Sequence, residues 1–268
     1  MNYKRILSGV ILFPIMAAIF IFGNTYLVDI LLSGIAIMSL YEFYKALKTK
    51  THPIEIIGYI AAAMIAIIHI IPMNIVLKII AAIIPTSILI LFLKIIITNM
   101  KTNIIDIAVT FFGICYIVIF IMFVSLVREN INNGKILIWF IFITAWGTDI
   151  FAYIIGKTLG KHKFTKISPN KTIEGCIGGT IGAIILSIIY TLICNKIWGL
   201  QINYIYITLI SCILSIVGQI GDLAASSIKR YTEIKDFSNL IPGHGGMLDR
   251  IDSVLFIAPF AYFLLSFL

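Results

Sequence analysis

Two aspartates, Asp249 and Asp252, have a spacing that suits metal chemistry. A separation of three residues puts both carboxylates on one face of a helix, with Arg250 between them turned aside. Two neighbouring carboxylates repel each other unless a cation lies between them. Carboxylates with retained waters suit Mg²⁺, which commonly bridges to substrate phosphates. Acids also favour helix starts, but that explanation accounts for one aspartate better than for the pair.

A glycine-rich run containing His244, Gly245 and Gly246 directly precedes this pair. Glycine backbone is flexible enough to approach a ligand closely, and this histidine is the only one flanked by candidate site residues. Asp222 ends one apolar segment and Asp149 lies late in another. An ionisable group at membrane depth is costly and therefore indicates function. The simpler alternative is a carboxylate that reaches the interface or pairs with a nearby lysine.

Residues that could bind anions follow Asp222 in the sequence. Arginine holds phosphate oxygens in a fork, and lysine supplies a compact charge. The candidates in this segment are Ser226, Lys229, Arg230, Lys235 and Asp236.

A second polar segment runs into the apolar stretch at residues 174–195. The N–H groups at a helix start, with Lys171 and the Thr172 hydroxyl, would form a phosphate cradle. The candidate residues of this segment are Ser168, Lys171, Thr172, Glu174 and Gly175. Four glycines have GxxxG spacing, which favours close helix packing over ligand contact. They are Gly175, Gly178, Gly179 and Gly182.

The composition indicates the kind of element that positions these residues. Hydrophobic residues make up 60% of the 268 residues and charged residues only 12%, whereas soluble domains carry about a quarter charged residues. Apolar runs of roughly 20 residues, long enough to cross a bilayer, recur along the chain. We therefore predict an all-α, polytopic integral membrane protein with nine transmembrane helices, at about 6–23, 26–45, 54–72, 75–98, 104–127, 136–156, 174–195, 203–222 and 250–268.

The distribution of Lys and Arg predicts the orientation. With the N-terminus inside, sixteen of the 20 Lys and Arg residues fall on the cytoplasmic side, which favours N-in and C-out. The two long polar segments, 156–174 and 222–252, lie on that side. This bias also explains the net charge of +8 without nucleic acid as a partner. We expect one membrane domain, in which residues 1–135 are a scaffold and residues 136–268 carry the catalytic loops.

Read together, the polar residues form two extended patterns. The first comprises Ser226, Ile228, Lys229, Arg230, Lys235, Asp236, Ser238, Ile241, Pro242, His244, Gly245, Gly246, Met247, Asp249, Arg250, Ile251 and Asp252. It closely resembles the pattern of phosphatidate cytidylyltransferases, also called CDP-diacylglycerol synthases. The segment from Asp149 to Gly179 is similar to a second block of that family, although Asn170 and Ile173 stand where Lys and Trp are expected. The N-terminal half matches only in character.

The resemblance implies transfer of CMP from CTP to phosphatidic acid, with release of pyrophosphate. It also implies Mg²⁺, a second cation such as K⁺, and a homodimer in the cell membrane with its active site at the cytoplasmic face. The metal ligands would be Asp222, Asp249 and Asp252. Other catalytic residues would be Lys229, Arg230, Lys235, Asp236 and His244. Substrate contacts would come from Asp149, Ser168, Lys171, Thr172, Glu174, Gly175, Ser226, Gly245, Gly246 and Arg250.

Three alternative functions would require other features of the sequence. A CTP-dependent polyprenol or phytol kinase would move the γ-phosphoryl group instead. A CDP-alcohol phosphatidyltransferase would need a motif that this chain lacks, because Leu223 follows Asp222 and the final acids are three residues apart. A transporter predicts polar residues through several spans of both halves, whereas here they collect at one face.

Overall fold

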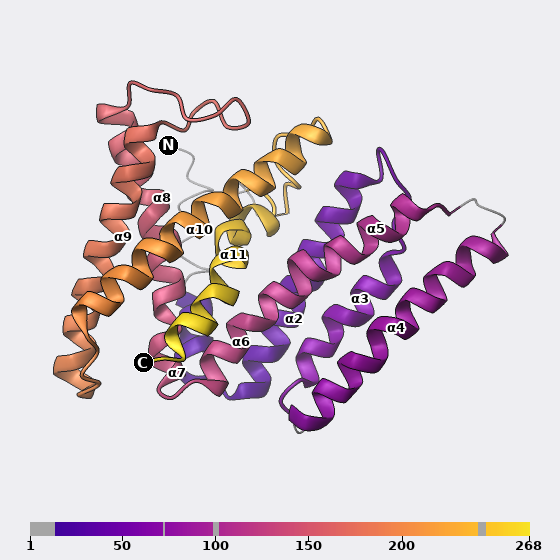
Figure 1. Cartoon of the computed structure of the whole chain (residues 1–268), viewed down its shortest axis with the longest axis horizontal. Helices are drawn as coiled ribbons and strands as arrows, with labels where there is room; N and C mark the ends of the chain where they lie inside the picture. The colour runs from indigo at the N-terminus through magenta and orange to yellow at the C-terminus, as the bar shows by residue number, and fades with distance from the viewer. Residues whose placement is uncertain (1–13, 72, 99–101, 241–244) are drawn as a thin grey trace. The chain divides into compact units, whose positions relative to one another are not determined.

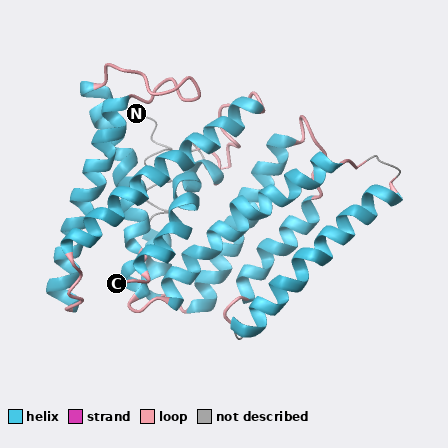
Figure 2. Ribbon diagram, in the orientation of Figure 1, coloured by secondary structure: helices cyan, strands magenta, loops and turns pink. Residues whose placement is uncertain are grey.

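The computed structural model describes residues 14–71, 73–98, 102–240 and 245–268. Within these ranges all regular elements are helical, and an isolated β-bridge joins Lys163 and Thr172. Figure 2 shows the helices and their connecting loops. The predicted all-α class is therefore confirmed for the described part of the chain.

The chain divides into two compact units, which are described separately. Unit 1 comprises Met1–Met122 and Ile234–Arg250, and unit 2 comprises Phe123–Glu233 and Ile251–Leu268. The functional division at residue 135 stays a prediction.

Unit 1 is built on a helix at residues 14–22 and on the helices that follow it. These are α2 (Thr25–Leu47), α3 (Glu55–Ala63), a 3₁₀ turn (Met64–Ile67), α4 (Met73–Ile97), α5 (Ile104–Gly113), a π-helical stretch (Ile114–Ile119) and the start of α6 (Phe120–Asn130). The fully buried Tyr44 of α2 holds this group together. Its hydroxyl donates to the carbonyl oxygen of Thr110, and its ring fills the space beside Gly58 and Gly113. A larger residue at either glycine would collide with that ring.

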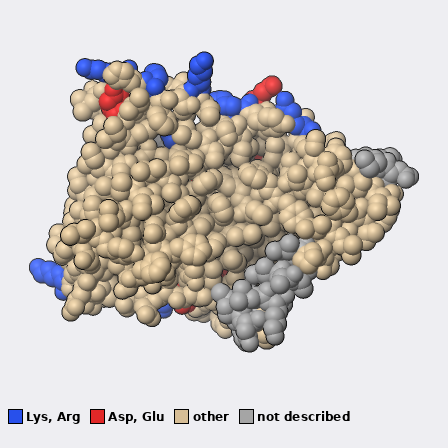
Figure 3. All heavy atoms as spheres, in the orientation of Figure 1, with Lys and Arg blue, Asp and Glu red and all other residues tan. Residues whose placement is uncertain are grey.

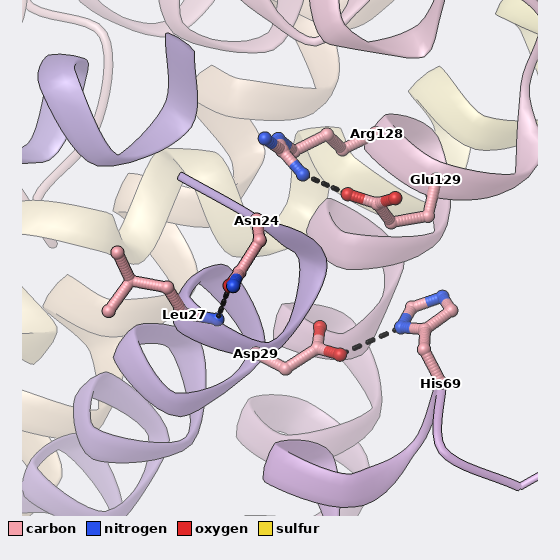
Figure 4. Close-up of polar contacts among 6 residues, drawn as sticks. All are labelled: Asn24, Leu27, Asp29, His69, Arg128 and Glu129. Atoms are coloured by element: carbon pink, nitrogen blue, oxygen red, sulfur yellow. Dashed lines mark hydrogen bonds and ion pairs between the residues drawn. The ribbon is translucent and has the colours of Figure 1, made fainter. Parts of the chain in front are cut away.

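Acidic side chains fix two further points of unit 1. Asp106 accepts the backbone N–H groups of His52 and Asn103, which ties the loop before α3 to the start of α5. The buried carboxylate of Asp29 pairs with Nδ1 of His69 at 2.8 Å, as Figure 4 shows. Each of these acids therefore stabilises packing within the unit.

Unit 2 contains the rest of α6, α7 (Gly134–Leu137), α8 (Trp139–Leu159), α9 (Ile173–Ile193) with a π-helical end (Cys194–Trp198), α10 (Tyr204–Tyr231) and most of α11 (Leu248–Leu265). In α6, Arg128 pairs with the adjacent Glu129, which compensates the buried guanidinium (Figure 4). Figure 1 shows α8 and α9 running side by side, joined by a loop at one end of the pair.

The four GxxxG glycines of α9 all lie against α8. A Cβ added to Gly175 would lie 2.8 Å from the carbonyl oxygen of Ala152, and one added to Gly179 would lie equally close to that of Thr148. Cβ additions at the other two glycines would collide with side chains of α8. The predicted role of these glycines in helix packing is therefore confirmed.

Five helical segments of the described chain are long and apolar enough to cross a membrane. They are Thr25–Leu47, Ile104–Asn130, Gly134–Leu159, Ile173–Trp198 and Tyr204–Tyr231. Two shorter apolar helices, Glu55–Ile67 and Ile88–Ile97, accompany them. Over α9 and α10, Figure 3 shows charged atoms only near the helix ends, with an uncharged surface between. The protein is therefore a helical membrane protein.

The sequence placed the end of the eighth helix at Asp222, and this boundary is wrong. Helix α10 continues without a break to Tyr231, so Ser226, Lys229 and Arg230 lie on a helix and not in a loop. Residues 223–231 contain no glycine or proline and include good helix formers. A fall in hydrophobicity marks where an apolar span ends, but the helix ends only where its backbone hydrogen bonding does.

Candidate active site

A cavity of about 300 Å³ opens in unit 2 among α8, α9, α10 and the residues that precede α9. Its wall includes residues from both long polar segments, 156–174 and 222–252. The predicted site residues on it are Asp149, Lys171, Thr172, Gly175 and Asp222. The fold therefore brings together residues that are up to about seventy positions apart in the sequence.

An ion pair joins the two polar segments, 156–174 and 222–252, directly. The Nζ atom of Lys171 lies 2.5 Å from Oδ2 of Asp222, and both side chains are about one quarter exposed. A second link runs from Nε of Arg230, which donates to the carbonyl oxygen of Ile167 at 3.2 Å. The segment before α9 is thus held against α10 at two points.

The start of α9 is built around Thr172. This residue is the N-cap, and its buried hydroxyl accepts the N–H of Gly175 at 3.1 Å. The segment before it folds back on itself, because the N–H of Phe164 donates to the carbonyl oxygen of Lys171. The carbonyl oxygen of Ser168 accepts the N–H of Lys171 in the same turn. The predicted cradle is therefore an ordered structure, in which the threonine hydroxyl caps the helix.

Glu174 lies in the first turn of α9 but is not on the cavity wall. Its Oε1 lies 2.6 Å from the ring nitrogen Nδ1 of His162, and both of its oxygens accept the backbone N–H of that histidine. In this position Glu174 orders the loop before α9.

Asp252 is a third acid of unit 2 in this environment, after Asp149 and Asp222. Its side chain is buried, Oδ1 accepts the N–H of Ser253, and the charges of Asp222, Asp149 and Lys229 act on it. Gly221 permits this approach, since a Cβ there would lie 2.8 Å from the carbonyl oxygen of Asp252. The glycine before Asp222 thus lets α10 and α11 pack closely beside the acids.

A hydrogen-bonded network of small polar side chains lies next to the cavity. The hydroxyls of Thr148 and Ser215 are 2.7 Å apart, and the Ser215 hydroxyl donates to Thr180 at 3.1 Å. The side-chain amide of Gln219 donates to Thr180 and to the carbonyl oxygen of Cys176. These residues connect α8, α9 and α10, and sequence reasoning missed them because single hydroxyls in apolar helices carry no spacing signal.

An apolar groove of about 480 Å³ adjoins the cavity along α9 and α10. Cys176 and Gln219 line both spaces, and the rest of the groove wall is mainly isoleucine and leucine. An elongated molecule with a polar head and an apolar tail would find both environments here.

Several other predicted site residues, Asp249 among them, lie in unit 1. Asp249 is buried, and its Oδ2 accepts the N–H groups of Phe237 at 2.9 Å and Gly246 at 3.1 Å. Gly245 has φ +84°, a left-handed backbone conformation that favours glycine. Asp249 therefore holds the backbone at Phe237 and at Gly246.

The remaining predicted residues take several positions. Lys235, Asp236 and Arg250 are exposed, and Ser226 is buried in α10. His244 lies outside the described residues, so its predicted role stays a prediction.

Comparison with known proteins identifies the family. The chain matches the cytidylyltransferase family over residues 3–268, which is nearly its full length. The chain belongs to this family.

Relatives of this cytidylyltransferase family member include three bacterial proteins, each named phosphatidate cytidylyltransferase. The Bacillus subtilis (strain 168) protein is 43% identical over 167 residues, which cover 62% of this chain and 59% of the relative. The Staphylococcus haemolyticus protein is 40% identical over 161 residues, covering 60% and 59%. The Synechocystis protein is 41% identical over 137 residues, covering 50% and 45%. The matches therefore span about half to three fifths of the relatives' length.

The acidic side chains of this family member fit a magnesium ion. Mg²⁺ is usually bound by one or two carboxylates and completes its shell with waters and substrate phosphates. Asp222 and Asp252 supply two such carboxylates within unit 2. Among the described residues, no three His, Cys, Asp or Glu side chains gather into a complete protein ligand set. Asp222 and Asp252 are oxygen donors of the type that Mg²⁺ binds.

Glu42 of α2 is a polar residue that the sequence patterns did not single out. Its carboxylate is fully buried, and it accepts hydrogen bonds from three residues of the segment 238–248 in unit 1. A signal was present, because an acid inside an apolar helix is costly and indicates a function. It was missed because Glu42 lies about two hundred residues from the segment it contacts.

Proposed function

We propose that this cytidylyltransferase family member transfers CMP from CTP to phosphatidic acid, which gives CDP-diacylglycerol and pyrophosphate for phospholipid synthesis. The observation that carries the proposal is the meeting of Lys171 and Asp222 on the wall of one polar cavity beside an apolar groove. Three relatives that share the name phosphatidate cytidylyltransferase support it.

The chemistry requires little proton transfer. A phosphate oxygen of phosphatidic acid is already anionic near neutral pH and attacks the α-phosphorus of CTP. A new P–O bond forms, the bond from the α-phosphorus to the bridging oxygen breaks, and pyrophosphate leaves with that electron pair. The site must therefore neutralise charge and align the two anions.

The cations of unit 2 would perform the alignment. Lys171 would exchange its contact with Asp222 for a phosphate oxygen of CTP, since ammonium groups bind either anion. Lys229 and Arg230, in the last turn of α10, would hold the phosphate of the lipid, with Lys235 as a further cation. Asp222, Asp249 and Asp252 would hold Mg²⁺, which supplies charge neutralisation at the phosphates, and K⁺ is the proposed second cation.

We place the protein in the cell membrane as nine spans, with the N-terminus inside, the C-terminus outside and the active site at the cytoplasmic face. In this arrangement CTP arrives from water while the lipid enters sideways along the apolar groove. We also propose a homodimer.

Position-specific labelling of CTP tests the reaction. Purified protein should move the label of α-³²P-CTP into the lipid fraction and release γ-label as pyrophosphate, with phosphatidic acid as the acceptor. Label from the γ-phosphate in the lipid, with α-label left in soluble CDP, would identify a lipid kinase. No label in any lipid acceptor would favour a transporter.

Thiol labelling tests the orientation. Cysteines introduced at Lys166 and Ser238, in a background without the four native cysteines, should be protected from an impermeant reagent in intact cells. A cysteine at Asn132 should react. Labelling of both large polar segments from outside would contradict the orientation.

A further inference from the structure

The carboxylate of Glu42 lies in an unusual place for an acid. It projects from α2, one of the helices long and apolar enough to cross a membrane, and no part of its side chain is exposed. Such burial is unfavourable unless every oxygen is compensated. Among the described residues, the hydrogen bonds that it accepts come from Ser238, Met247 and Leu248 of unit 1.

Three donors surround the carboxylate. The Ser238 hydroxyl donates to Oε1 at 2.5 Å, and the backbone N–H of Met247 donates to the same oxygen at 2.9 Å. The N–H of Leu248 donates to Oε2 at 2.8 Å. The last two groups belong to the start of α11, where N–H groups have no partner within the helix and a negative charge is favourable. Glu42 therefore caps α11 from another helix.

The fit of the segment around Glu42 is tight. A Cβ added to Gly246 would lie 2.6 Å from Oε2 of Glu42, so only glycine fits beside the carboxylate. The same glycine donates its N–H to Asp249, which also accepts the N–H of Phe237. Glu42 and Asp249 thus accept consecutive N–H groups of one short stretch of backbone, and the position of one limits that of the other.

We propose that Glu42 is a positioning residue, which fixes the start of α11 and through it the carboxylate of Asp249. The inference rests on the proposed function in one respect, the role of Asp249 as a ligand of Mg²⁺. It gives a helix of the expected N-terminal scaffold an indirect part in the reaction, through the position of Asp249. Glu42 touches neither reacting group and acts through the backbone of residues 246–248.

The variant Glu42→Gln tests this role. Glutamine keeps the shape of the side chain, but its amide NH₂ replaces one acceptor oxygen and would face an N–H or O–H donor. Asp106→Asn is the matched control, since Asp106 is an equally buried acid of unit 1 that accepts two backbone N–H groups elsewhere. Ser238→Ala removes one of the three hydrogen bonds and gives a milder variant if Glu42→Gln cannot be purified.

Two readouts are measured on each purified variant. Hydrogen exchange should become faster in residues 237–248 for Glu42→Gln, and only near residues 52 and 103 for Asp106→Asn. The Mg²⁺ concentration for half-maximal activity should rise about 10- to 100-fold in Glu42→Gln and stay unchanged in the control. Ser238→Ala should show smaller changes in the same direction.

The outcomes separate the two proposals. Unchanged exchange in residues 237–248 would overturn the role of Glu42, whatever the activity. Faster exchange with an unchanged Mg²⁺ requirement would also overturn it, because loosening the segment would then have no effect on the binding of Mg²⁺. Wild-type protein without cytidylyl transfer would overturn the proposed function, while hydrogen exchange would still decide whether Glu42 holds the segment.

Discussion

Acids of the two units illustrate two kinds of partner for a carboxylate. In unit 1, Glu42 and Asp106 accept backbone N–H groups, and their charges are compensated by peptide dipoles. In unit 2, Asp222 lines a cavity and pairs with the ammonium group of Lys171. A carboxylate that accepts backbone N–H groups fixes the backbone around it. One that pairs with lysine can exchange that partner for another cation. In an apolar chain, therefore, the partner of an acid tells more about its role than its burial does.

The largest effect is expected from the acids of unit 2. Asp252→Asn and Asp222→Asn should each lower turnover by about 10³-fold or more at saturating Mg²⁺, because a neutral amide is a poor ligand and compensates little charge. Each variant should still insert and purify normally. The measurement is label transfer from α-³²P-CTP per purified molecule. Near-normal activity of either variant would contradict the distinction between the units.

A smaller effect is expected for the lysine in the cavity. Lys171→Met keeps most of the side-chain stem but removes one charge-assisted contact, which contributes about 1.5–3 kcal/mol. The KM for CTP should therefore rise by roughly 10- to 100-fold, with a smaller change in kcat. Lys196→Met, at an exposed lysine beyond the other end of α9, is the matched control and should leave KM unchanged. An unchanged KM in Lys171→Met would mean that Lys171 serves only to hold Asp222.

The smallest effect on activity is expected in α2. Asp29→Asn weakens the pair with His69, which should lower the free energy of unfolding by about 1.5–3 kcal/mol. Activity per folded molecule should stay within about twofold of wild type, because the pair only stabilises unit 1. Thermal unfolding in detergent, followed by an assay of the folded fraction, measures both quantities. A tenfold loss of activity without loss of stability would show that Asp29 or His69 also serves the reaction directly.

Much of the fold could be predicted from the sequence, since long apolar runs leave little choice of structure. The predicted spans at 26–45 and 174–195 lie within α2 and within α9 with its π-helical end. The GxxxG glycines predicted a close contact between helices, which is the one between α8 and α9, because glycine lets two helix backbones approach closely. The convergence of Lys171 and Asp222 followed from the assumption that both polar segments serve one site.

Other features depend on contacts that spacing cannot reveal. The continuation of α10 to Tyr231 was missed because hydrophobicity reports where a span ends and not where a helix does. Glu42 carries no local pattern, and its partners lie at the far end of the sequence. The hydroxyl of Thr172 was expected to face phosphate, but helix capping already engages it.

The length of α10 has a consequence for the depth of the site. Its 28 residues extend about 42 Å at 1.5 Å per residue, whereas the hydrocarbon core of a bilayer is about 30 Å thick. The apolar part ends near Asp222, so in the proposed membrane placement the last turn, with Lys229 and Arg230, extends to the level of the lipid headgroups. A thicker or thinner bilayer changes the tilt of such a helix at a cost of fractions of a kcal/mol per ångström. Under the proposed function, the chain length of the surrounding lipids would shift the acids relative to the phosphate they act on, so the rate of lipid synthesis would respond to membrane thickness.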